Sequence, residues 1–421
     1  MAPRLTTKAP TENTILQFHS VKGDRVQSCI ENRLSRGIIT TQDASVIRMY
    51  IAESKSSNGI GTIRAMKLAY TLASWRRFIG EYSTLNITDV YESITKLKEG
   101  KSHKGIPFSQ NTIYDHIRIL KTFLLWMIEN DLSTLPEKKV NGLKMPTRNM
   151  MTKVAADLLT PQEMDAMLKA CMRSRDRALI VTLYEGGFRI NELGALKWGD
   201  LKFDPRGVIV NTDKKTGKPR YIRLINAKPV LLQWKEDYPF DPTPECLVFV
   251  NEKNTALTHQ GISRQLKRIA ERAGLTKHIT PHIFRHTRIT NLIQMGMSES
   301  VIKMMVWGNM STNMFRTYAH LTGEDTDQAL MKIYGITDGT KTKKIQPMAA
   351  RQCPECKHIN LHTTEYCLNC LTPLTEEATQ CMDVLAKDMR NHPESFISYM
   401  KQFAAKAAAD AVDEERMRTG T

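Results

Sequence analysis

The sequence predicts a mainly α-helical protein that contains a small antiparallel β-sheet and carries a cysteine-rich module after its helical domains. Apolar residues recur at helical spacing through most of the chain. Two short apolar segments, 208–210 and 221–224, flank a polar stretch that contains Gly217, which is the pattern of a β-hairpin. Because 421 residues exceed what a single core organises, we expect two or three domains.

The first predicted domain is helical and covers residues 19–135. It follows a polar, aperiodic stretch, 1–18, that we expect to be a flexible N-terminus. One helix is expected to begin at Thr62 and another after Ser109, because apolar residues then follow at intervals of three and four. Arg and Lys alternate with the apolar residues in both, which is typical either of an ordinary solvated helix face or of a DNA-binding domain.

The segment 136–156 is predicted to be a basic linker. It contains two prolines, a glycine and five Lys or Arg residues against a single acid, Glu137. The second domain, 157–335, opens with Thr160, a proline and Glu163, the sequence of a helix N-terminal capping box. Within this domain we expect a third short strand over 247–250, and helices over 260–273, 282–294, 298–306 and from Asn313 onward.

Three further segments complete the chain. Residues 336–349 are polar and basic and are predicted to be a second linker. Residues 350–375 hold the paired cysteines, and residues 376–421 form a C-terminal helical region.

The charge of the chain indicates an anionic partner. Lys and Arg number 60 against 44 Asp and Glu, a net charge of +16. A field of this sign attracts polyanions, of which nucleic acid is the commonest, although positive charge also serves solubility alone. The sequence contains no apolar run long enough to span a membrane, and its first residues lack the apolar core of a secretion signal. We therefore expect a soluble, cytoplasmic and DNA-associated protein.

Five residues of the second domain have the chemistry of phosphoryl transfer: Arg189, Lys215, His282, Arg285 and Tyr318. Two guanidinium groups can hold the oxygens of one phosphate and stabilise a pentavalent transition state. A Lys can protonate a leaving alkoxide, a His can exchange a proton, and a Tyr phenol can attack phosphorus to form a covalent phosphoester. Each residue alone is more often structural, so their spacing by itself indicates only a phosphate-binding domain.

Three segments in order resemble the tyrosine recombinase (phage integrase) family over residues 160–325. They are Gly-Phe-Arg-Ile-Asn-Glu-Leu with Leu-Lys-Trp-Gly-Asp, then Lys-Thr-Gly-Lys-Pro-Arg before an apolar strand, then Thr-Pro-His-Ile-Phe-Arg-His-Thr. The helical region 19–135 resembles the family's core-binding domain more weakly. The resemblance implies a mixed α/β catalytic domain of the tyrosine recombinase type.

The resemblance also implies a role for each site residue. Arg189 and Arg285 would bind the phosphate, and Lys215, on the hairpin, would be the general acid. His282 would be its imidazole partner, and Tyr318 would be the nucleophile. Glu192 would orient the helix that carries the first arginine.

One position departs from the family pattern. Nine residues before the nucleophile the family usually has His, sometimes Trp, and this sequence has Asn309. An amide can donate a hydrogen bond to a phosphate oxygen but cannot carry charge or shuttle a proton. Trp307, with its indole N–H, is a nearby substitute. Reduced or condition-dependent activity is therefore an expectation, and complete inactivity is the less favoured one.

The four paired cysteines, Cys353, Cys356, Cys367 and Cys370, predict a structural zinc site. Two C-x-x-C pairs separated by ten residues can surround one tetrahedral Zn²⁺, and such a short module needs the metal to fold. It resembles a zinc ribbon. A redox C-x-x-C is the alternative, and His358 and His362 are spare ligands.

The family resemblance implies a site-specific DNA recombinase or integrase, as mobile genetic elements carry. It would cleave and rejoin double-stranded DNA through a 3′-phosphotyrosyl intermediate, without ATP or a catalytic cofactor, as a homotetramer on DNA. Two alternatives remain. A type IB topoisomerase shares the chemistry, and a DNA-binding protein with impaired cleavage is suggested by Asn309.

Overall fold

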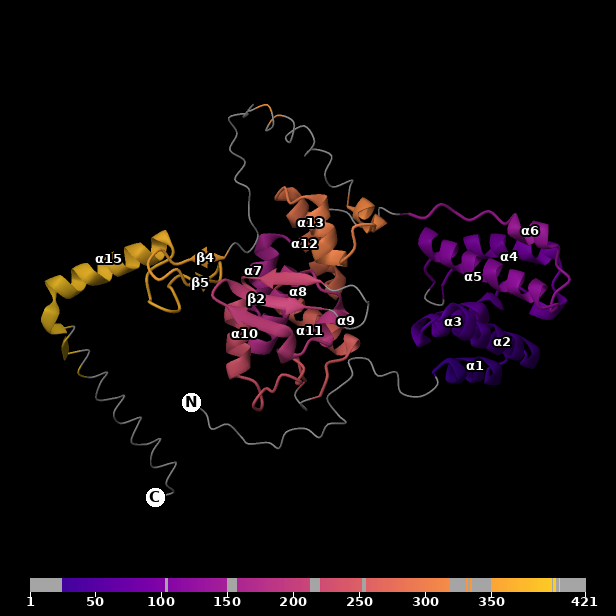
Figure 1. The fold of residues 1–421 in the computed structure, drawn as a ribbon, viewed down its shortest axis with the longest axis horizontal. Coiled ribbons are helices and arrows are strands. Elements are labelled where there is room, and N and C mark those ends of the chain that lie inside the picture. The colour runs from indigo at the N-terminus through magenta and orange to yellow at the C-terminus, as the bar shows by residue number, and fades with distance from the viewer. Residues whose placement is uncertain are drawn as a thin grey trace, which may run out of the picture. The chain divides into compact units, whose positions relative to one another are not determined.

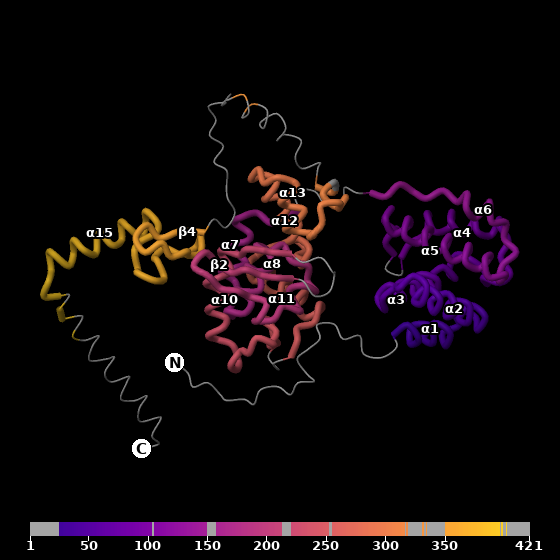
Figure 2. Tube along the Cα trace, viewed as in Figure 1, coloured from indigo at the N-terminus to yellow at the C-terminus, as the bar shows by residue number. Residues whose placement is uncertain are grey.

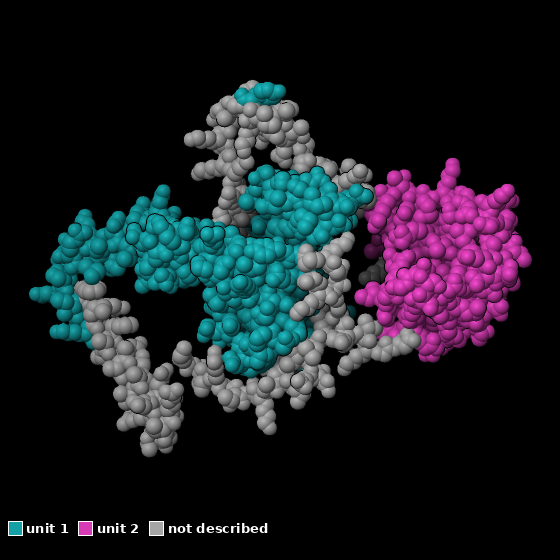
Figure 3. Space-filling view, in the orientation of Figure 1, with its two compact units in different colours: residues 1–18, 153–421 teal, residues 19–152 magenta. Residues whose placement is uncertain are grey.

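The computed structural model describes residues 25–102, 105–149, 157–212, 220–251, 255–318, 331, 334, 350–395, 397, 398 and 401. The described residues fall into two units, one within residues 19–152 and one that begins at residue 153 (Figure 3). The predicted flexible N-terminus and the predicted linker 336–349 lie outside the described residues, as do Lys215 and most of the chain beyond residue 395.

The first unit is helical, as predicted. Its helices are α1 (Arg25–Ser35), α2 (Thr41–Asn58), α3 (Thr62–Trp75), α4 (Ile87–Glu99), α5 (Gln110–Glu129) and α6 (Glu137–Asn141), with a 3₁₀ turn η1 (Tyr82–Thr84) (Figure 1). The predicted helix starts at Thr62 and after Ser109 are confirmed. Ser109 caps α5 because its side chain accepts a hydrogen bond from the Thr112 amide.

The core of this unit holds a buried carboxylate among large aromatic side chains. Trp75, Tyr82 and Phe123 are fully buried. Asp43 is buried as well, and its oxygens accept from Nε of Arg76 at 2.6 Å and from the Tyr82 amide at 3.2 Å. These bonds offset the cost of removing the charge from water, and they join α2 to the end of α3.

The structure differs from the predicted linker at its start. Residues 137–141 form helix α6, and Val140 and Leu143 are buried in the core of the first unit. Burying each of these side chains stabilises the unit by roughly 1.5–3 kcal/mol. The few apolar residues of this basic segment had not indicated that it belongs to a core. Further along, Asn111 exchanges two hydrogen bonds of 2.9 Å with the backbone of Asn149. Most of the described part of the basic segment therefore packs on α5.

The second unit contains a three-stranded antiparallel sheet covered by helices. The strands β1 (Leu201–Asp204), β2 (Gly207–Asn211) and β3 (Tyr221–Leu224) lie in that order, with Val210 opposite Ile222. The predicted hairpin between 208 and 224 is thereby confirmed. Its inward positions are fully buried, and α8 (Ser174–Gly186) and α10 (Ala227–Glu236) pack against it. The fold class that the sequence predicted is that of the structure.

The other helices of this unit are α7 (Pro161–Lys169), α9 (Ile190–Gly194), α11 (His259–Arg272), α12 (Pro281–Gln294) and α13 (Glu299–Trp307). The capping box of Thr160 and Glu163 begins α7 as predicted. The expected strand at 247–250 is wrong: these residues are buried but make only isolated bridges to Lys197 and Ala256. Lys197 is followed at once by a 3₁₀ helix, Trp198–Asp200, so the bridge to Leu247 cannot continue as a ladder.

A buried carboxylate fixes the helix that follows the sheet. Glu185, near the end of α8, accepts hydrogen bonds from the backbone amides of Ile225 at 2.8 Å, Asn226 at 3.0 Å and Ala227 at 2.9 Å. These amides open α10, and the N-terminus of a helix favours a negative charge. The contact holds α8 against the end of β3.

Helices α12 and α13 lie next to each other (Figure 2) and form a small second core with the 3₁₀ turn η4 (Asn313–Thr317), where the sequence predicts a helix from Asn313 onward. Its buried residues are Ile289, Leu292, Ile302, Val306, Trp307 and Tyr318. Gly308 ends α13 with a φ of 63°, a left-handed conformation that favours glycine. That turn directs the chain from Trp307 to Asn309.

The cysteine module has two short strands, β4 (Arg351–Gln352) and β5 (Ile359–Asn360), followed by helix α15 (Glu376–Asn391). Leu361 packs against the core of the second unit. Among the described residues, no helix has both the length and the apolar composition that crossing a membrane requires.

Candidate active site

Arg189 stands at the N-terminus of α9, where the chain leaves α8. Gly187 ends α8 with a φ of 53°. Phe188 then packs into the core, and Arg189, the next residue, lies at the edge of that core. The Arg189 side chain is 41% exposed. Its Nη1 lies 2.8 Å from Oε1 of Glu192, and its backbone N–H donates to Oε2 of the same residue. Glu192 thus holds both the side chain and the helix end, the arrangement that its predicted orienting role requires.

Arg285 lies on α12 and is buried. Its Nη1 donates to the carbonyl oxygen of Gly187 at 2.5 Å and its Nη2 to that of Val306 at 2.9 Å. Its guanidinium carbon is 5.5 Å from the ring centroid of Trp307. Burial, and then repulsion by Arg189 and Arg220, lowers the pKa of Arg285 to about 9. An anion bound here would relieve that repulsion.

Arg220 is a third arginine of this cluster, and it was absent from the site residues that the motifs predicted. Its side chain is 3% exposed. It forms an ion pair with Oε2 of Glu192, and its Nη1 donates to the carbonyl oxygen of Val306 at 2.5 Å. A signal was present in the sequence, since Arg220 shares the alternation of the inward residues Ile222 and Leu224.

Tyr318 is 4% exposed and packs in the small core beside Trp307. Its Oη lies 2.5 Å from Nδ1 of His286. Burial raises the pKa of Tyr318 to about 12, although the charge of Arg285 acts in the opposite direction. The motifs had indicated His282, one helical turn earlier, and not His286. The two rings are 6.4 Å apart between centroids, and His282 is the exposed one.

Asn309 and Lys215 complete the predicted set. Asn309 follows Gly308, and its Oδ1 accepts a hydrogen bond of 3.0 Å from the Ser311 amide. That bond leaves the amide NH₂ as the part of the side chain able to donate to an anion. Lys215 lies outside the described residues, but the base of its hairpin is closed, because the Thr212 amide donates to the Arg220 carbonyl.

The structure therefore brings together residues from four separate stretches of the chain. Arg189, Arg220 and Arg285 supply three positive charges around one carboxylate, Glu192, next to a buried tyrosine. Such a cluster has the charge and the hydrogen-bond donors to bind a phosphodiester, and the phenol is a group able to attack it.

Residues 157–324 match the model of the phage integrase family. The chain carries a phage integrase family domain. It is a tyrosine recombinase, an enzyme that cleaves and rejoins DNA through a phosphotyrosine intermediate. The family and the activity that the motifs predicted are thereby confirmed, whereas the roles of the individual residues stay predictions.

Known proteins similar to this tyrosine recombinase agree with the match. The tyrosine recombinase XerC of Listeria welshimeri is 24% identical over 316 residues, which cover 69% of this chain and 98% of the relative. The site-specific recombinase XerH, solved with a palindromic difH substrate, has a TM-score of 0.52 at 20% identity, covering 76% of this chain and 92% of that one. The lambda integrase bound to DNA has a TM-score of 0.50 at 17% identity, covering 65% and 94%. The two solved structures share the fold.

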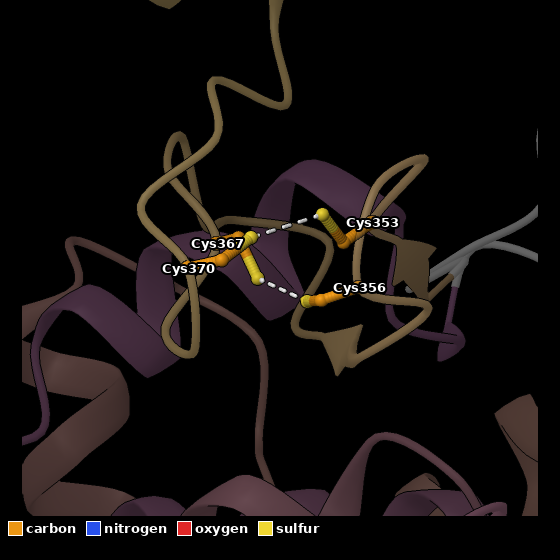
Figure 4. A group of neighbouring side chains, drawn as sticks. All are labelled: Cys353, Cys356, Cys367 and Cys370. Atoms are coloured by element: carbon orange, nitrogen blue, oxygen red, sulfur yellow. Dashed lines mark hydrogen bonds between the residues drawn. The ribbon is translucent and has the colours of Figure 1, made fainter.

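The four cysteines of the C-terminal module converge, as Figure 4 shows. Their sulfur atoms all lie within 4.8 Å of one another, and Cys353–Cys370 and Cys356–Cys367 are 3.5 Å apart. A tetrahedral zinc site with Zn–S bonds of about 2.3 Å separates its sulfurs by about 3.8 Å, so the group is compatible with a metal such as zinc. Desolvation raises the pKa of Cys367, but the amides of Asn369 and Cys370 outweigh it and lower the pKa to about 6.

The spare ligand His362 lies elsewhere. Its Nε2 is 2.5 Å from Oδ1 of Asp165 on helix α7 of the recombinase domain. Together with Leu361, which packs on the core of that unit, this contact holds the cysteine module against α7.

Proposed function

We propose that the cluster around Tyr318 is the active site of a site-specific DNA recombinase. The observation that carries this proposal is the buried Tyr318 beside the crowded arginines, whose mutual repulsion a bound phosphate would relieve. Arg189 and Arg285 bind the non-bridging oxygens of one phosphodiester. Glu192 and Arg220 hold these two arginine side chains in position. Asn309 adds an amide hydrogen bond to the same phosphate.

Strand cleavage follows from these positions. The Oη of Tyr318 bonds to phosphorus, the bond from phosphorus to the 5′ oxygen breaks, and Lys215 gives a proton to that oxygen. The product is a 3′-phosphotyrosyl link and a free 5′-hydroxyl. Attack by the 5′-hydroxyl of a partner strand reverses these steps. The phosphotyrosine retains the bond energy, so the reaction needs no ATP.

The partner in this proposal is double-stranded DNA, bound by a homotetramer in the cytoplasm. The net charge of +16 and the basic first unit support the DNA contact. A lambda integrase tetramer bound to a Holliday junction, similar in fold at a TM-score of 0.50, supports the tetramer. In this proposal the first unit, 19–152, and the recombinase domain, 157–335, both contact the duplex.

The cysteine module belongs to the proposal as a zinc ribbon. Cys353, Cys356, Cys367 and Cys370 would hold one Zn²⁺, which stabilises a segment too small for its own core. The metal is structural in this proposal and takes no part in strand cleavage.

The test uses a suicide substrate, a nicked site from which the short 5′ fragment diffuses away and traps the covalent complex. The wild type accumulates a protein–DNA adduct, and Tyr318→Phe binds the same DNA without forming any. Tyr366→Phe, in the cysteine module, is the matched control and retains the adduct. Adduct formation by Tyr318→Phe would refute the assignment. Binding without adduct in the wild type would favour the DNA-binding alternative, and relaxation of supercoils without strand exchange would favour the topoisomerase.

A further inference from the structure

The hydroxyl of Tyr318 is hydrogen-bonded to His286, a residue outside the predicted set. The distance from Oη to Nδ1 is 2.5 Å, and the ring centroids are 5.5 Å apart. The phenol is 4% exposed, so bulk water is nearly excluded from the oxygen that attacks phosphorus. The group nearest to the proton of the nucleophile is therefore an imidazole nitrogen.

Three residues of α12 have different surroundings, because their side chains leave the helix in different directions. Arg285 is buried and directed into the arginine cluster, where it reaches the carbonyls of Gly187 and Val306. His286, the next residue, faces Tyr318, while His282, a turn earlier, is exposed. A phosphate held by Arg285 would thus have His286 on the side of the nucleophile.

The chemistry requires a proton acceptor at this place. A phenol attacks phosphorus effectively only as it loses its proton, and burial makes that loss harder here, because it raises the pKa of Tyr318 to about 12. The positive charge of Arg285 acts in the favourable direction but does not take up the proton. An imidazole can take up a proton through the lone pair of its unprotonated nitrogen, which makes His286 a chemically suitable acceptor.

We propose that His286 accepts the proton of Tyr318 during strand cleavage and returns it during rejoining; this rests on the proposed function. In cleavage the Oη–P bond forms, the proton passes from Oη to Nδ1, the bond from phosphorus to the 5′ oxygen breaks, and that oxygen takes a proton from Lys215. In rejoining the 5′-hydroxyl gives its proton to Lys215 and attacks phosphorus, and the phenol oxygen recovers its proton from His286. This transfer requires Nδ1 to be the unprotonated nitrogen before cleavage, so that Tyr318 donates the hydrogen bond.

The decisive variant is His286→Asn. The Asn amide oxygen lies near the place of Nδ1, so it can accept the hydrogen bond and hold the phenol, but it cannot take up a proton at neutral pH. We expect single-turnover cleavage of the suicide substrate to fall by ~10²- to 10⁴-fold, with DNA affinity unchanged. His278→Gln, an exposed histidine just before α12, is the matched control and cleaves at the wild-type rate. If His286→Asn lowers the unfolding temperature, His286→Gln is measured beside it.

Two chemical readouts separate proton transfer from a structural role. Replacing Tyr318 by 3,5-difluorotyrosine lowers the pKa of the phenol, and we expect this to restore cleavage in His286→Asn. In a substrate with sulfur in place of the 5′ oxygen, the leaving group is a thiolate, which departs without a proton from a general acid. This substrate should therefore restore cleavage in Lys215→Ala but not in His286→Asn. Cleavage by His286→Asn within about threefold of the wild type, or its rescue by the sulfur substrate, would overturn the inference. If the inference about His286 fails in this way but Tyr318→Phe still forms no adduct, the proposed function is retained.

Discussion

Arg220, which is buried, and Glu192, which is partly buried, form an ion pair in which Nη2 of Arg220 donates to Oε2 of Glu192. The other carboxylate oxygen, Oε1, binds Arg189. Arg220 also shares the carbonyl oxygen of Val306 with Arg285. Arg220, the residue just before β3, is thus connected to Arg189 and Arg285, the two proposed phosphate-binding arginines. A shift of the hairpin that carries Lys215 would therefore change the positions of both.

We predict that Arg220→Met destabilises the recombinase domain by roughly 3–5 kcal/mol, because it removes the buried partner of an ion pair and leaves the Glu192 carboxylate without the charge of Arg220. Urea denaturation measures the loss. Arg223→Met, on strand β3 itself, is the matched control: the side chains of Arg223 and of its partner Asp204 are partly exposed, so the loss of stability should be much smaller. If the two variants lose the same free energy of unfolding, the contacts of Arg220 do not stabilise the domain more than those of Arg223.

The burial of Tyr318 predicts a pH dependence of stability. Its pKa is about 12 in the folded protein and near 10 for an exposed tyrosine, so the folded state holds the proton more tightly. The stabilisation is complete below about pH 10 and is lost as the pH rises towards 12. We expect the free energy of unfolding of the wild type to fall, relative to Tyr318→Phe, by roughly 1 kcal/mol at about pH 11. Urea denaturation of both proteins at about pH 8 and pH 11 gives the difference, and parallel behaviour would show that the phenol is exposed.

Asn309 is predicted to act through its NH₂ group. Asn309→Ala should lower single-turnover cleavage by about 10- to 100-fold, the value of one hydrogen bond to a charged group. Asn309→Asp keeps an oxygen for the Ser311 amide, so the turn survives, but it replaces the donor by a negative charge and should be at least as impaired. Asn309→His should cleave at least as fast as the wild type. If Asn309→Ala cleaves at the wild-type rate, the amide takes no part in catalysis.

The four-cysteine group is predicted to hold about one zinc per chain. Cys353→Ser should lose the metal and expose residues 350–375 to proteolysis, and it should weaken recombination between two DNA molecules more than cleavage of one suicide site. Cys381→Ser is the matched control, since this exposed cysteine lies on α15 outside the group. Metal analysis and limited proteolysis of the two variants make the comparison. A Cys353→Ser protein with full zinc content would place the metal elsewhere.

The sequence by itself determined those features that depend on neighbours along the chain. The capping box at Thr160 and Glu163 needs only four consecutive residues, and the hairpin of β2 and β3 follows from alternation around a polar turn. The spacing of the cysteines likewise predicted their convergence. The family motifs were enough to identify a tyrosine recombinase, because they specify residue types in order.

Only the tertiary structure decided which groups meet across the chain. Arg220 reaches a carbonyl 86 residues away, and His286 reaches a phenol 32 residues away. The strand alternation marks Arg220 as an inward residue, but no local pattern identifies the partner of either side chain. The basic segment after Pro136 misled for the same reason: Val140 and Leu143 gain their stability from a core made by distant helices. Burial is a property of the packed whole, and it is burial that gives Arg285 and Tyr318 their shifted pKa values and Arg220 its partners.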